Sequence, residues 1–447
     1  MARILSPDDY GITALPAVFL AIAGVFIDCG FSGAMIRKPV LSEEDLSTAL
    51  YYSLGVGLVC YILIFFSSPW IASFYNVPIL EDLIHWAALS FLITPLTTPQ
   101  NILLNRKLDF KTPTIVGLVS QICMGICGIS LAYYGFGVWA LVLSTLLSNV
   151  VNLLLKWFVV RWFPKTGWSK DSFRYLWGYG NKLVASYLIG HIYENIVPVV
   201  VGKYYSTAAL GEYNRAQGYC RLVATNTTNI IQQVTFPVLS KIQDDEDSLR
   251  RNYRRIIRTS AFVIFPLMML LAALARPLII LMLTEKWEGC ILLLQLMCVS
   301  MMWYPIHAIN LNLLQVKGRT DFFLKLEIMK KSYGLIAMVI TLPISIVAVI
   351  LSEWITNVLS LIVNTYYTQK IIQVGFVRQM KDVAPSLLTS LLMFVLIIII
   401  NKFLDSYILQ LLIGGSLGVL FYCGIAFLLH FKELEELKSL LIKPNVI

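Results

Sequence analysis

The residues in this chain that are best suited to bind an anion lie in a stretch long enough to cross a lipid bilayer. Between Leu210 and Leu239, polar side chains recur every three or four residues and so share one face of a helix. An arginine at the centre of a lipid-facing helix costs about 2.5–3.5 kcal/mol. We therefore expect this face to line a water-filled cavity, where Arg221 contacts a polar, anionic substrate. The stripe comprises Asn214, Gln217, Arg221, Thr225, Thr228 and Gln232, with Arg215 next to it nearer the outer end.

Other charged residues interrupt apolar stretches, and each has two interpretations. Arg215 contacts substrate or braces its own half of the protein, and Lys182 contacts substrate or anchors its helix at the interface. His191 and Glu194, three residues apart, form a proton- or cation-linked pair or a structural one. Asp28 pairs with an arginine or binds a coupling ion, because packing alone would not retain a carboxylate there.

The elements that must position these side chains are membrane-spanning helices. Of the 447 residues, 58% are hydrophobic and 14% are charged, whereas a soluble domain carries about 25% charged residues. The sequences Ser6-Pro7-Asp8-Asp9 and Ser42-Glu43-Glu44-Asp45 are typical of helix starts. With about 20 residues needed for one crossing, we predict about thirteen spans. Their expected limits are 11–36, 46–74, 83–104, 114–134, 138–160, 178–201, 210–239, 259–283, 290–316, 326–350, 352–372, 384–404 and 407–430.

The positions of the charges indicate topology and not nucleic-acid binding. The net charge is +9, from 35 basic and 26 acidic residues. Most basic residues fall in alternate loops, for example in 241–258, which places those loops and the C-terminus in the cytoplasm next to anionic lipids. The eight cysteines form neither a CxxC motif nor a Cys/His cluster. We therefore expect no metal site and no cofactor.

A weak internal repeat relates the two halves of the chain. Ser6 and Gly11 match Ser206 and Gly211 at an offset of 200 positions (211 minus 11). Further along, the offset becomes 210 positions (310 minus 100), which aligns Thr97 and Gln100 with His307 and Asn310. Matching helices then run in the same direction, as in a parallel repeat about an axis near the membrane normal. This alignment predicts that His307 and Asn310 also line the cavity, although such amide stripes are often interhelical contacts.

The repeat predicts the organisation of the chain into lobes. The span 178–201 precedes the second repeat, whereas no equivalent span precedes Ser6, so we expect one further helix upstream of Met1. The expected fold is an all-α polytopic membrane protein with two pseudo-symmetric helical lobes around a central cavity. The predicted parts are a first lobe at 1–177, a second lobe at 178–380, two trailing helices at 381–430 and a cytoplasmic tail at 431–447.

Several distinctive motifs occur in order along the chain, among them ARILSPDDYG, DCGFSGAMIRK, LGEYNRAQ, FPVLSKIQDDEDSLRR, EKW and NLNLLQVKGRTDFFLKLEI. Together they resemble those of bacterial polysaccharide flippases of the multidrug/oligosaccharidyl-lipid/polysaccharide exporter superfamily. The resemblance implies fourteen helices, and we expect that the thirteen predicted spans correspond to the second helix onward. It also implies a multi-pass protein of the bacterial inner membrane that moves undecaprenyl-diphosphate-linked oligosaccharide units outward by alternating access, for O-antigen, capsule or exopolysaccharide synthesis. Coupling to an H⁺ or Na⁺ gradient and contact with a polysaccharide polymerase and chain-length machinery are further expectations.

Three alternatives remain open. An ion-coupled exporter of drugs or small molecules would share the fold class. A membrane glycan polymerase would be an enzyme, but the predicted outer loops are about ten residues or fewer and carry no nucleotide-binding motif, so we expect no enzymatic activity. A pure assembly scaffold would have no reason to retain Asp28, Glu194 and Arg221 within apolar stretches.

Overall fold

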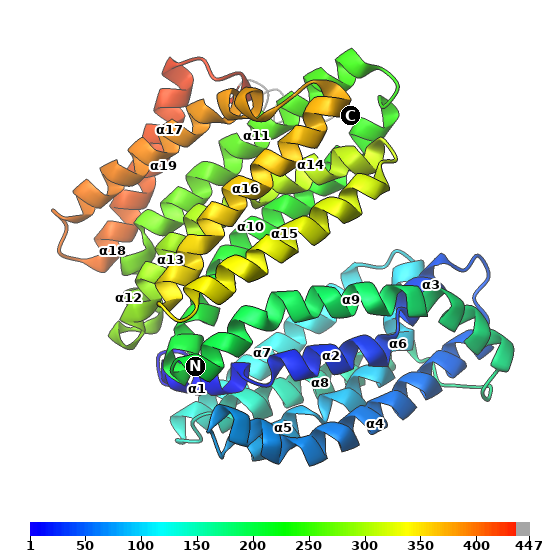
Figure 1. Cartoon of the computed structure of the whole chain (residues 1–447). Helices are drawn as coiled ribbons and strands as arrows, with labels where there is room; N and C mark the ends of the chain where they lie inside the picture. The colour runs from blue at the N-terminus through cyan, green and yellow to red at the C-terminus, as the bar shows by residue number, and fades with distance from the viewer. Residues whose placement is uncertain (435–447) are drawn as a thin grey trace. The chain divides into compact units, whose positions relative to one another are not determined.

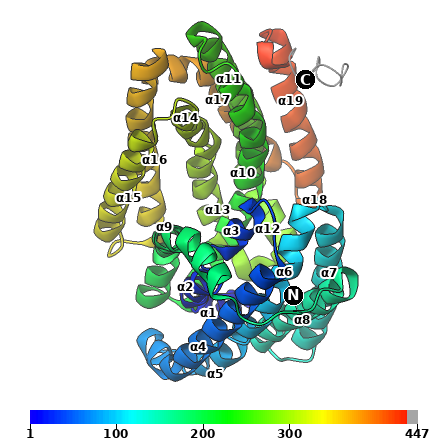
Figure 2. The ribbon, with the colours of Figure 1, turned by 90° about the vertical axis from the view of Figure 1, so that its right-hand side faces the viewer.

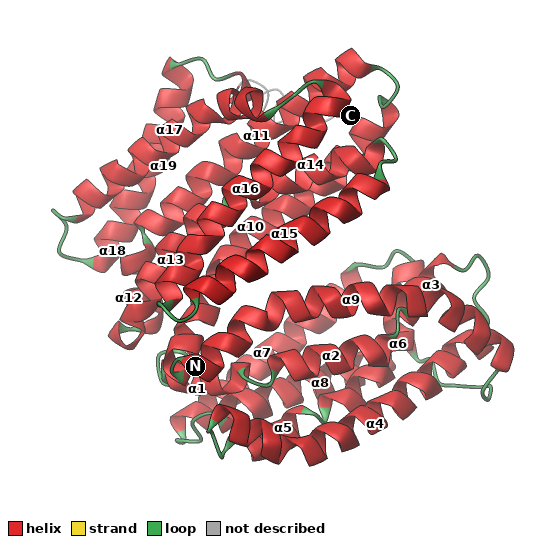
Figure 3. Cartoon of the chain, viewed as in Figure 1, coloured by secondary structure: helices red, strands yellow, loops and turns green. Residues whose placement is uncertain are grey.

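The computed structural model describes residues 1–434, without the side chains of residues 182, 183, 185, 186, 234, 320, 321, 323 and 324. Helices and their connections make up this described part, which contains no β-strand (Figure 3). The expected all-α fold class is confirmed. Of the predicted tail at 431–447, residues 435–447 lie outside the described residues.

The chain divides into two compact helical units, one of residues 1–211 and one that begins at Glu212 (Figure 1). The predicted lobe boundary, between residues 177 and 178, lies earlier in the chain. The difference arises because helix α9 (Lys170–Tyr204) packs against α2 (Ala17–Asp28) and α4 (Glu43–Tyr75) of the first unit. The cavity expected between two lobes stays a prediction.

The first unit is a bundle of long helices and shorter helical pieces. In addition to α2, α4 and α9, it contains α1 (Pro7–Ala14), α3 (Phe31–Arg37), α5 (Leu80–Ala87), α6 (Ser90–Arg106), α7 (Lys111–Tyr133), α8 (Trp139–Val160) and the first turn of α10 (Thr207–Lys241). The span predicted at 11–36 is therefore divided into α1, α2 and α3. The first break lies at Pro16, which cannot donate a backbone hydrogen bond. The second lies at Cys29 and Gly30, which both have a left-handed backbone conformation.

Local capping chemistry sets two of the helix starts that were predicted from sequence. The Asp9 amide donates to Ser6 Oγ at 3.2 Å, and the Ser6 amide donates back to the Asp9 carboxylate at 2.9 Å. Ser42 and Asp45 form the same reciprocal pair at the start of α4, and Lys38 Nζ lies 2.6 Å from that carboxylate. Both expected helix starts are confirmed, because each cap satisfies amides that the first turn leaves free.

Helix α9 approaches the break between α2 and α3 so closely that a side chain would not fit. A Cβ at Gly180 would overlap the carbonyl oxygen of Cys29. Beneath this crossing, Phe31, Met35 and Leu176 are almost fully buried in one apolar cluster. Close backbone contact at a small residue is a common way for helices to pack in membranes, where burial of apolar surface supplies little driving force.

The two repeat-related segments meet each other within the first unit. A Cβ at Gly11 would overlap the carbonyl oxygen of Thr207, and a Cβ at Gly211 would overlap that of Pro7. Since Thr207 is the repeat equivalent of Pro7 at the same offset of 200 positions (207 minus 7), the contact is reciprocal. Thr207 Oγ1 also donates a hydrogen bond to Asp8. The structure thus gives a physical reason for the aligned pair Gly11 and Gly211.

The second unit contains the remaining helices and is held together by α11 and α17. Its elements after α10 are α11 (Glu246–Ala273), α12 (Ala275–Leu283), α13 (Glu288–Met301), α14 (Tyr304–Val316), α15 (Thr320–Thr341), α16 (Ile346–Ile372), α17 (Phe376–Asn401), α18 (Tyr407–Leu409) and α19 (Gly415–Leu428). Helix α17 packs along α11 and against α19 (Figure 2). Arg254 of α11 donates two bonds of 2.7 Å to Asp382 of α17, and Tyr422 of α19 donates to the Phe262 carbonyl at 2.9 Å.

Nine helical segments within the described residues are long and apolar enough to cross a membrane. The other four predicted spans, at 83–104, 178–201, 210–239 and 326–350, coincide with helices α5–α6, α9, α10 and α15. The predicted end at residue 350 is wrong, because α15 ends at Thr341 before Pro343 and α16 begins at Ile346. Whether these four helices cross the membrane stays a prediction.

We predict that Gly11→Ala and Gly211→Ala each destabilise the protein, because either methyl group forces two backbones apart. The expected cost is about 1–3 kcal/mol for each. The double variant should lose less stability than the two single variants added together, since the first substitution already opens the contact. Apparent melting temperatures in detergent would test this, with Gly117→Ala, where a Cβ meets nothing within 4 Å, as the control. Additive losses would show that the two glycines do not share one contact.

Candidate functional site

The polar stripe of α10 is accessible near Arg221 and closed further along. Arg221 is exposed, whereas Asn214, Gln217 and Thr225 are half-buried. Gln217 Nε2 donates to the Tyr213 hydroxyl at 3.3 Å. Thr228, only 1% exposed, donates to the Ala224 carbonyl of its own helix. The part of the stripe from Asn214 to Thr225 can therefore present a guanidinium and amides to a ligand. The buried hydroxyl of Thr228 cannot contact a ligand.

Arg215 lies near the N-terminal end of α10 in contact with the EKW motif. Its guanidinium lies 5.6 Å from the ring centroid of Trp287, which is fully buried. One turn earlier on the chain, Glu212 lies against Gly289, where a Cβ would overlap its carboxylate. These contacts join the start of α10 to the start of α13, and they favour the bracing interpretation of Arg215 over substrate contact.

The structure brings a second charged residue to Arg221, and sequence reasoning missed it. Glu353 of α16 interacts electrostatically with Arg221 and with Tyr213, and it lies within reach of the Ser300 hydroxyl of α13. Asn357, one turn beyond Glu353, donates to Ser300 Oγ at 2.7 Å. We call these residues of α10, α13 and α16 the Arg221–Glu353 cluster. The rule that singled out Asp28, a carboxylate inside an apolar run, would also have found Glu353.

Asn310, predicted to line the cavity, lies in a buried network in this structure, and its contact with substrate stays a prediction. It is 1% exposed, and its Oδ1 accepts from the Tyr253 hydroxyl at 2.9 Å. Gln379 of α17 accepts from Asn310 Nδ2 at 3.2 Å and also donates to Tyr253 at 3.0 Å. The network joins α11, α14 and α17. Gln100, the repeat equivalent of Asn310, is likewise fully buried, so the alignment identified structural amides.

His307 lies three residues before Asn310 but contacts a different helix. It is half-buried, and its Nδ1 lies 3.2 Å from Asn364 Nδ2 of α16. Asn364 itself is 1% exposed. The nearby Lys330, which pairs with Glu327 on α15, contributes a positive charge to the surroundings of His307. His307 therefore faces polar groups of α15 and α16 within the second unit, and its substrate contact stays a prediction.

Asp28 has a structural task at the break between α2 and α3. Its carboxylate accepts a hydrogen bond from the Gly30 amide at 3.1 Å and another from the Ser32 hydroxyl. These two donors belong to the start of α3, where no preceding turn supplies acceptors. The bonds explain why a carboxylate is retained in an apolar stretch without an arginine or a coupling ion, although they do not test ion binding.

The predicted residues of α9 are only partly described. His191 is half-buried, and its backbone carbonyl accepts from Asn195 Nδ2 at 2.8 Å, while Glu194 is exposed. The side chain of Lys182 lies outside the described residues. The pairing of His191 with Glu194 and the substrate contact of Lys182 both stay predictions.

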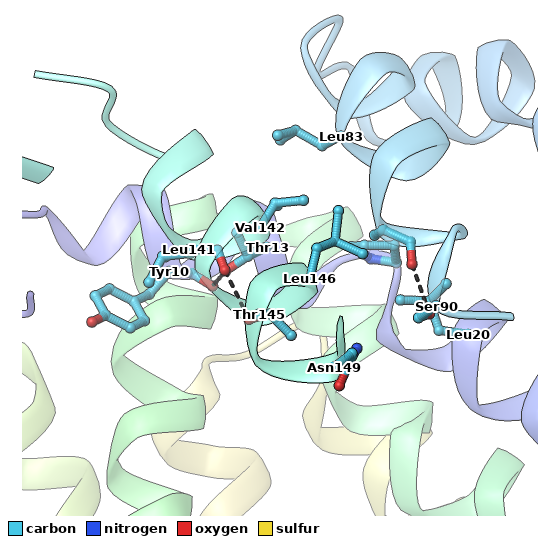
Figure 4. Close-up of a pocket in the computed structure, with 12 residues that line it drawn as sticks. Tyr10, Thr13, Leu20, Leu83, Ser90, Leu141, Val142, Thr145, Leu146 and Asn149 are labelled. Carbon is cyan, nitrogen blue, oxygen red and sulfur yellow. Dashed lines mark hydrogen bonds between the residues drawn. The ribbon is translucent and has the colours of Figure 1, made fainter. Parts of the chain in front are cut away.

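An apolar cavity of about 330 Å³ lies within the first unit (Figure 4). Three of its hydroxyl groups already donate to backbone carbonyls: those of Thr13 and Thr145 to carbonyls of their own helices, and that of Ser90 to Ala87 of α5. The wall is otherwise mainly aliphatic, so this cavity can hold an apolar group but has few free polar groups to recognise a sugar or phosphate. It is lined by Tyr10, Thr13, Pro16, Leu20, Leu83, Ala87, Ser90, Leu141, Val142, Thr145, Leu146 and Asn149.

The helical architecture is that of multi-pass membrane transporters. The structure is similar to that of the lipid II flippase MurJ in an inward closed conformation, with a TM-score of 0.76 and 18% identity over 96% of this chain and 94% of MurJ. It is also similar to an inward-facing multidrug resistance MATE family transporter of the MOP superfamily, with a TM-score of 0.62 and 15% identity over 83% of this chain and 93% of the transporter. At these identities the likeness defines the fold.

The family model described as "Polysaccharide biosynthesis protein" matches residues 1–292, and the chain belongs to this family. Among its relatives, the lipopolysaccharide biosynthesis protein WzxC of Escherichia coli K12 is 25% identical over 346 residues, which are 76% of this chain and 70% of WzxC. The teichuronic acid biosynthesis protein TuaB of Bacillus subtilis 168 is 26% identical over 307 residues, which are 67% of this chain and 62% of TuaB. The resemblance noted in the sequence motifs is confirmed.

We predict that Gln379→Leu lowers stability by about 2–4 kcal/mol, because it removes the bonds that Gln379 makes to the buried polar atoms of Tyr253 and Asn310. The measurement is the apparent melting temperature in detergent. Gln369→Leu, at an exposed position near the end of α16, provides the control and should have little effect. An equal shift in both variants would argue against a stabilising network.

We also predict that Asp28→Asn retains most of the stability, whereas Asp28→Ala loses about 1 kcal/mol. Asparagine still offers an oxygen to the Gly30 amide, but alanine offers none. Thermal unfolding of both variants tests the assignment. Equal losses in the two variants would show that the negative charge, and not the acceptor oxygen, is what the helix break requires.

Proposed function

We propose that this protein moves a lipid-linked oligosaccharide across the bacterial inner membrane, with undecaprenyl diphosphate as the lipid carrier. The observation that carries the proposal is the exposed Arg221 on the polar stripe of α10, a helix expected to cross the membrane, in a member of a polysaccharide biosynthesis family. The MurJ-like fold agrees with it, because MurJ is a lipid II flippase.

The proposed roles follow from the chemistry of the headgroup. Arg221 binds the diphosphate, since a guanidinium is always charged and matches phosphate oxygens in a two-point contact. The amides of Asn214 and Gln217 and the hydroxyl of Thr225 bind sugar hydroxyls. The polyprenyl chain stays in the lipid phase, so the protein needs to shelter only the polar headgroup. Transport then requires the binding face to open alternately to the two sides of the membrane.

Several features of the proposed process go beyond the binding contact. The cytoplasmic C-terminus follows from the positions of the basic residues. Coupling to an H⁺ or Na⁺ gradient would supply direction, and a polymerase with its chain-length machinery would consume the flipped unit. The protein itself forms no glycosidic bond in this proposal, and it belongs to transport and not to enzymatic synthesis.

A second candidate function is export of drugs or other small molecules, which the likeness to a multidrug resistance transporter favours. An exposed arginine opposes the binding of hydrophobic cations and favours anions. The two functions therefore predict different ligands. Thermal stabilisation by undecaprenyl diphosphate supports the flippase, whereas stabilisation by hydrophobic cations alone supports the drug exporter.

We predict that Arg221→Ala lowers flipping of an undecaprenyl-diphosphate-linked oligosaccharide at least about tenfold, because it removes charge-assisted bonds to phosphate. Arg221→Lys should lie between the wild type and Arg221→Ala, since lysine keeps the charge but loses the two-point contact. The measurement is transfer of the labelled lipid between leaflets of proteoliposomes, with new glycosidic bonds assayed in parallel.

The matched control is Arg276→Ala, which removes an exposed arginine that pairs with Glu288 at 3.1 Å. It should flip at the wild-type rate. Wild-type flipping by Arg221→Ala would reject the assignment of Arg221, and formation of a glycosidic bond by the purified protein would reject the transport proposal in favour of an enzyme.

A further inference from the structure

The Arg221–Glu353 cluster contains two opposite charges that come from different helices of the same unit. Glu353 lies in α16, one of the helices long and apolar enough to cross a membrane. The carboxylate is half-buried and interacts electrostatically with Arg221 and Tyr213 of α10. A carboxylate in this position is costly unless an opposite charge compensates it. Arg221 supplies that charge.

The part of α16 that carries Glu353 is held against α13 by the side chains of two residues that follow Glu353. Trp354 Nε1 donates to the Leu296 carbonyl of α13 at 2.9 Å, and Asn357 donates to Ser300 Oγ at 2.7 Å. Ser300 is only 4% exposed. These bonds join α16 to α13 at the level of Glu353. The carboxylate is therefore a fixed group, and its neighbours do not depend on a mobile loop.

The part of α10 that carries Arg221 also packs against α13, at nearly the same level. Its neighbour Cys220 is fully buried, and Cys220 Sγ lies 3.6 Å from Cys298 Sγ. Cys298 precedes Ser300 by two residues. Helix α13 thus positions both charged groups, one through Cys298 and the other through Ser300. The guanidinium remains exposed, so an anion can reach it.

We propose that Glu353 is the internal counter-ion that the anionic headgroup displaces when it binds Arg221. This inference rests on the proposed function and adds a residue that limits affinity for the substrate. A diphosphate at Arg221 meets the negative charge of Glu353, and the repulsion offsets part of the attraction to the guanidinium. Binding is then strong enough to capture the headgroup and weak enough to release it, as translocation requires.

The test measures binding of undecaprenyl diphosphate to the purified full-length protein in nanodiscs made of uncharged lipid. Glu353→Gln removes the charge and keeps the shape of the side chain, and it should bind the probe about tenfold more tightly. Arg221→Gln should bind it at least about tenfold more weakly. In the Arg221→Gln background, Glu353→Gln should change the affinity by less than about twofold, because the group it competes for is absent.

The controls separate a counter-ion from a general effect of charge. Glu44→Gln removes an exposed carboxylate in the first turn of α4 and should bind as the wild type does. Glu353→Asp keeps the charge and should also stay close to the wild type. Should Glu353→Gln fail to fold, the reversed pair Arg221→Glu with Glu353→Arg tests the same contact, since the second reversal should restore the folding yield lost by the first.

Two results would overturn the inference while leaving the proposed function intact. One is unchanged or weaker binding by Glu353→Gln, and the other is an equal gain in affinity with and without Arg221. If the reversed pair is used, a folding yield that stays as low as that of the single reversal would also overturn the inference. Wild-type binding by Arg221→Gln would instead reject the phosphate contact itself, and with it both the proposed role of Arg221 and the counter-ion.

Discussion

A charged side chain inside a membrane-spanning helix needs water, an opposite charge or a set of hydrogen bonds, and this requirement shapes the whole protein. Asp28 meets it by bonding donors at a helix break. Arg215 meets it by lying over a buried indole ring, and Arg254, near the start of α11, makes a two-point contact with a carboxylate. Arg221 differs from these residues because its guanidinium is exposed beside a carboxylate on another helix. An exposed guanidinium can change its partner, and a substrate-binding residue must do so.

The parts of the fold that depend on local chemistry were predictable from the sequence. The capping boxes at Ser6 and Ser42 involve residues only three positions apart, so the local sequence alone indicates the two helix starts. The repeat was also readable, although each match was weak. Gly11 and Gly211 take part in one contact, in which each glycine leaves room for a backbone carbonyl of the other segment. A repeat that places its equivalent segments against each other constrains both copies at the same positions, which is why the two glycines align.

The parts that depend on contacts between distant helices could not be predicted in this way. The pattern of polar residues on α14 gave no sign that Asn310 is buried against α11 and α17, because an amide that lines a cavity and one that bonds neighbouring helices have the same spacing. The placement of α9 in the first unit depends on the close approach of Gly180 to Cys29, which lies far away in sequence. Glu353 was detectable as a charge in an apolar run, but its partner on α10 required the tertiary structure.

A protein that moves a charged headgroup across a membrane has to bind it without holding it. Tight binding at one arginine would arrest the substrate, and an apolar path would exclude it. The apolar cavity of the first unit has a mainly aliphatic wall, and its Thr13 and Thr145 hydroxyls already donate to carbonyls, so it offers little to a sugar phosphate. The second unit instead brings a guanidinium of α10 and a carboxylate of α16 together next to α13. In the proposed mechanism, Glu353 competes with the anion for Arg221. The guanidinium then has an opposite charge beside it when the site is empty and stays accessible when the headgroup arrives. The choice of Arg221 over the other arginines follows from this exchange, because a phosphate can replace one carboxylate neighbour more easily than it can break a two-point salt bridge or a stacked contact.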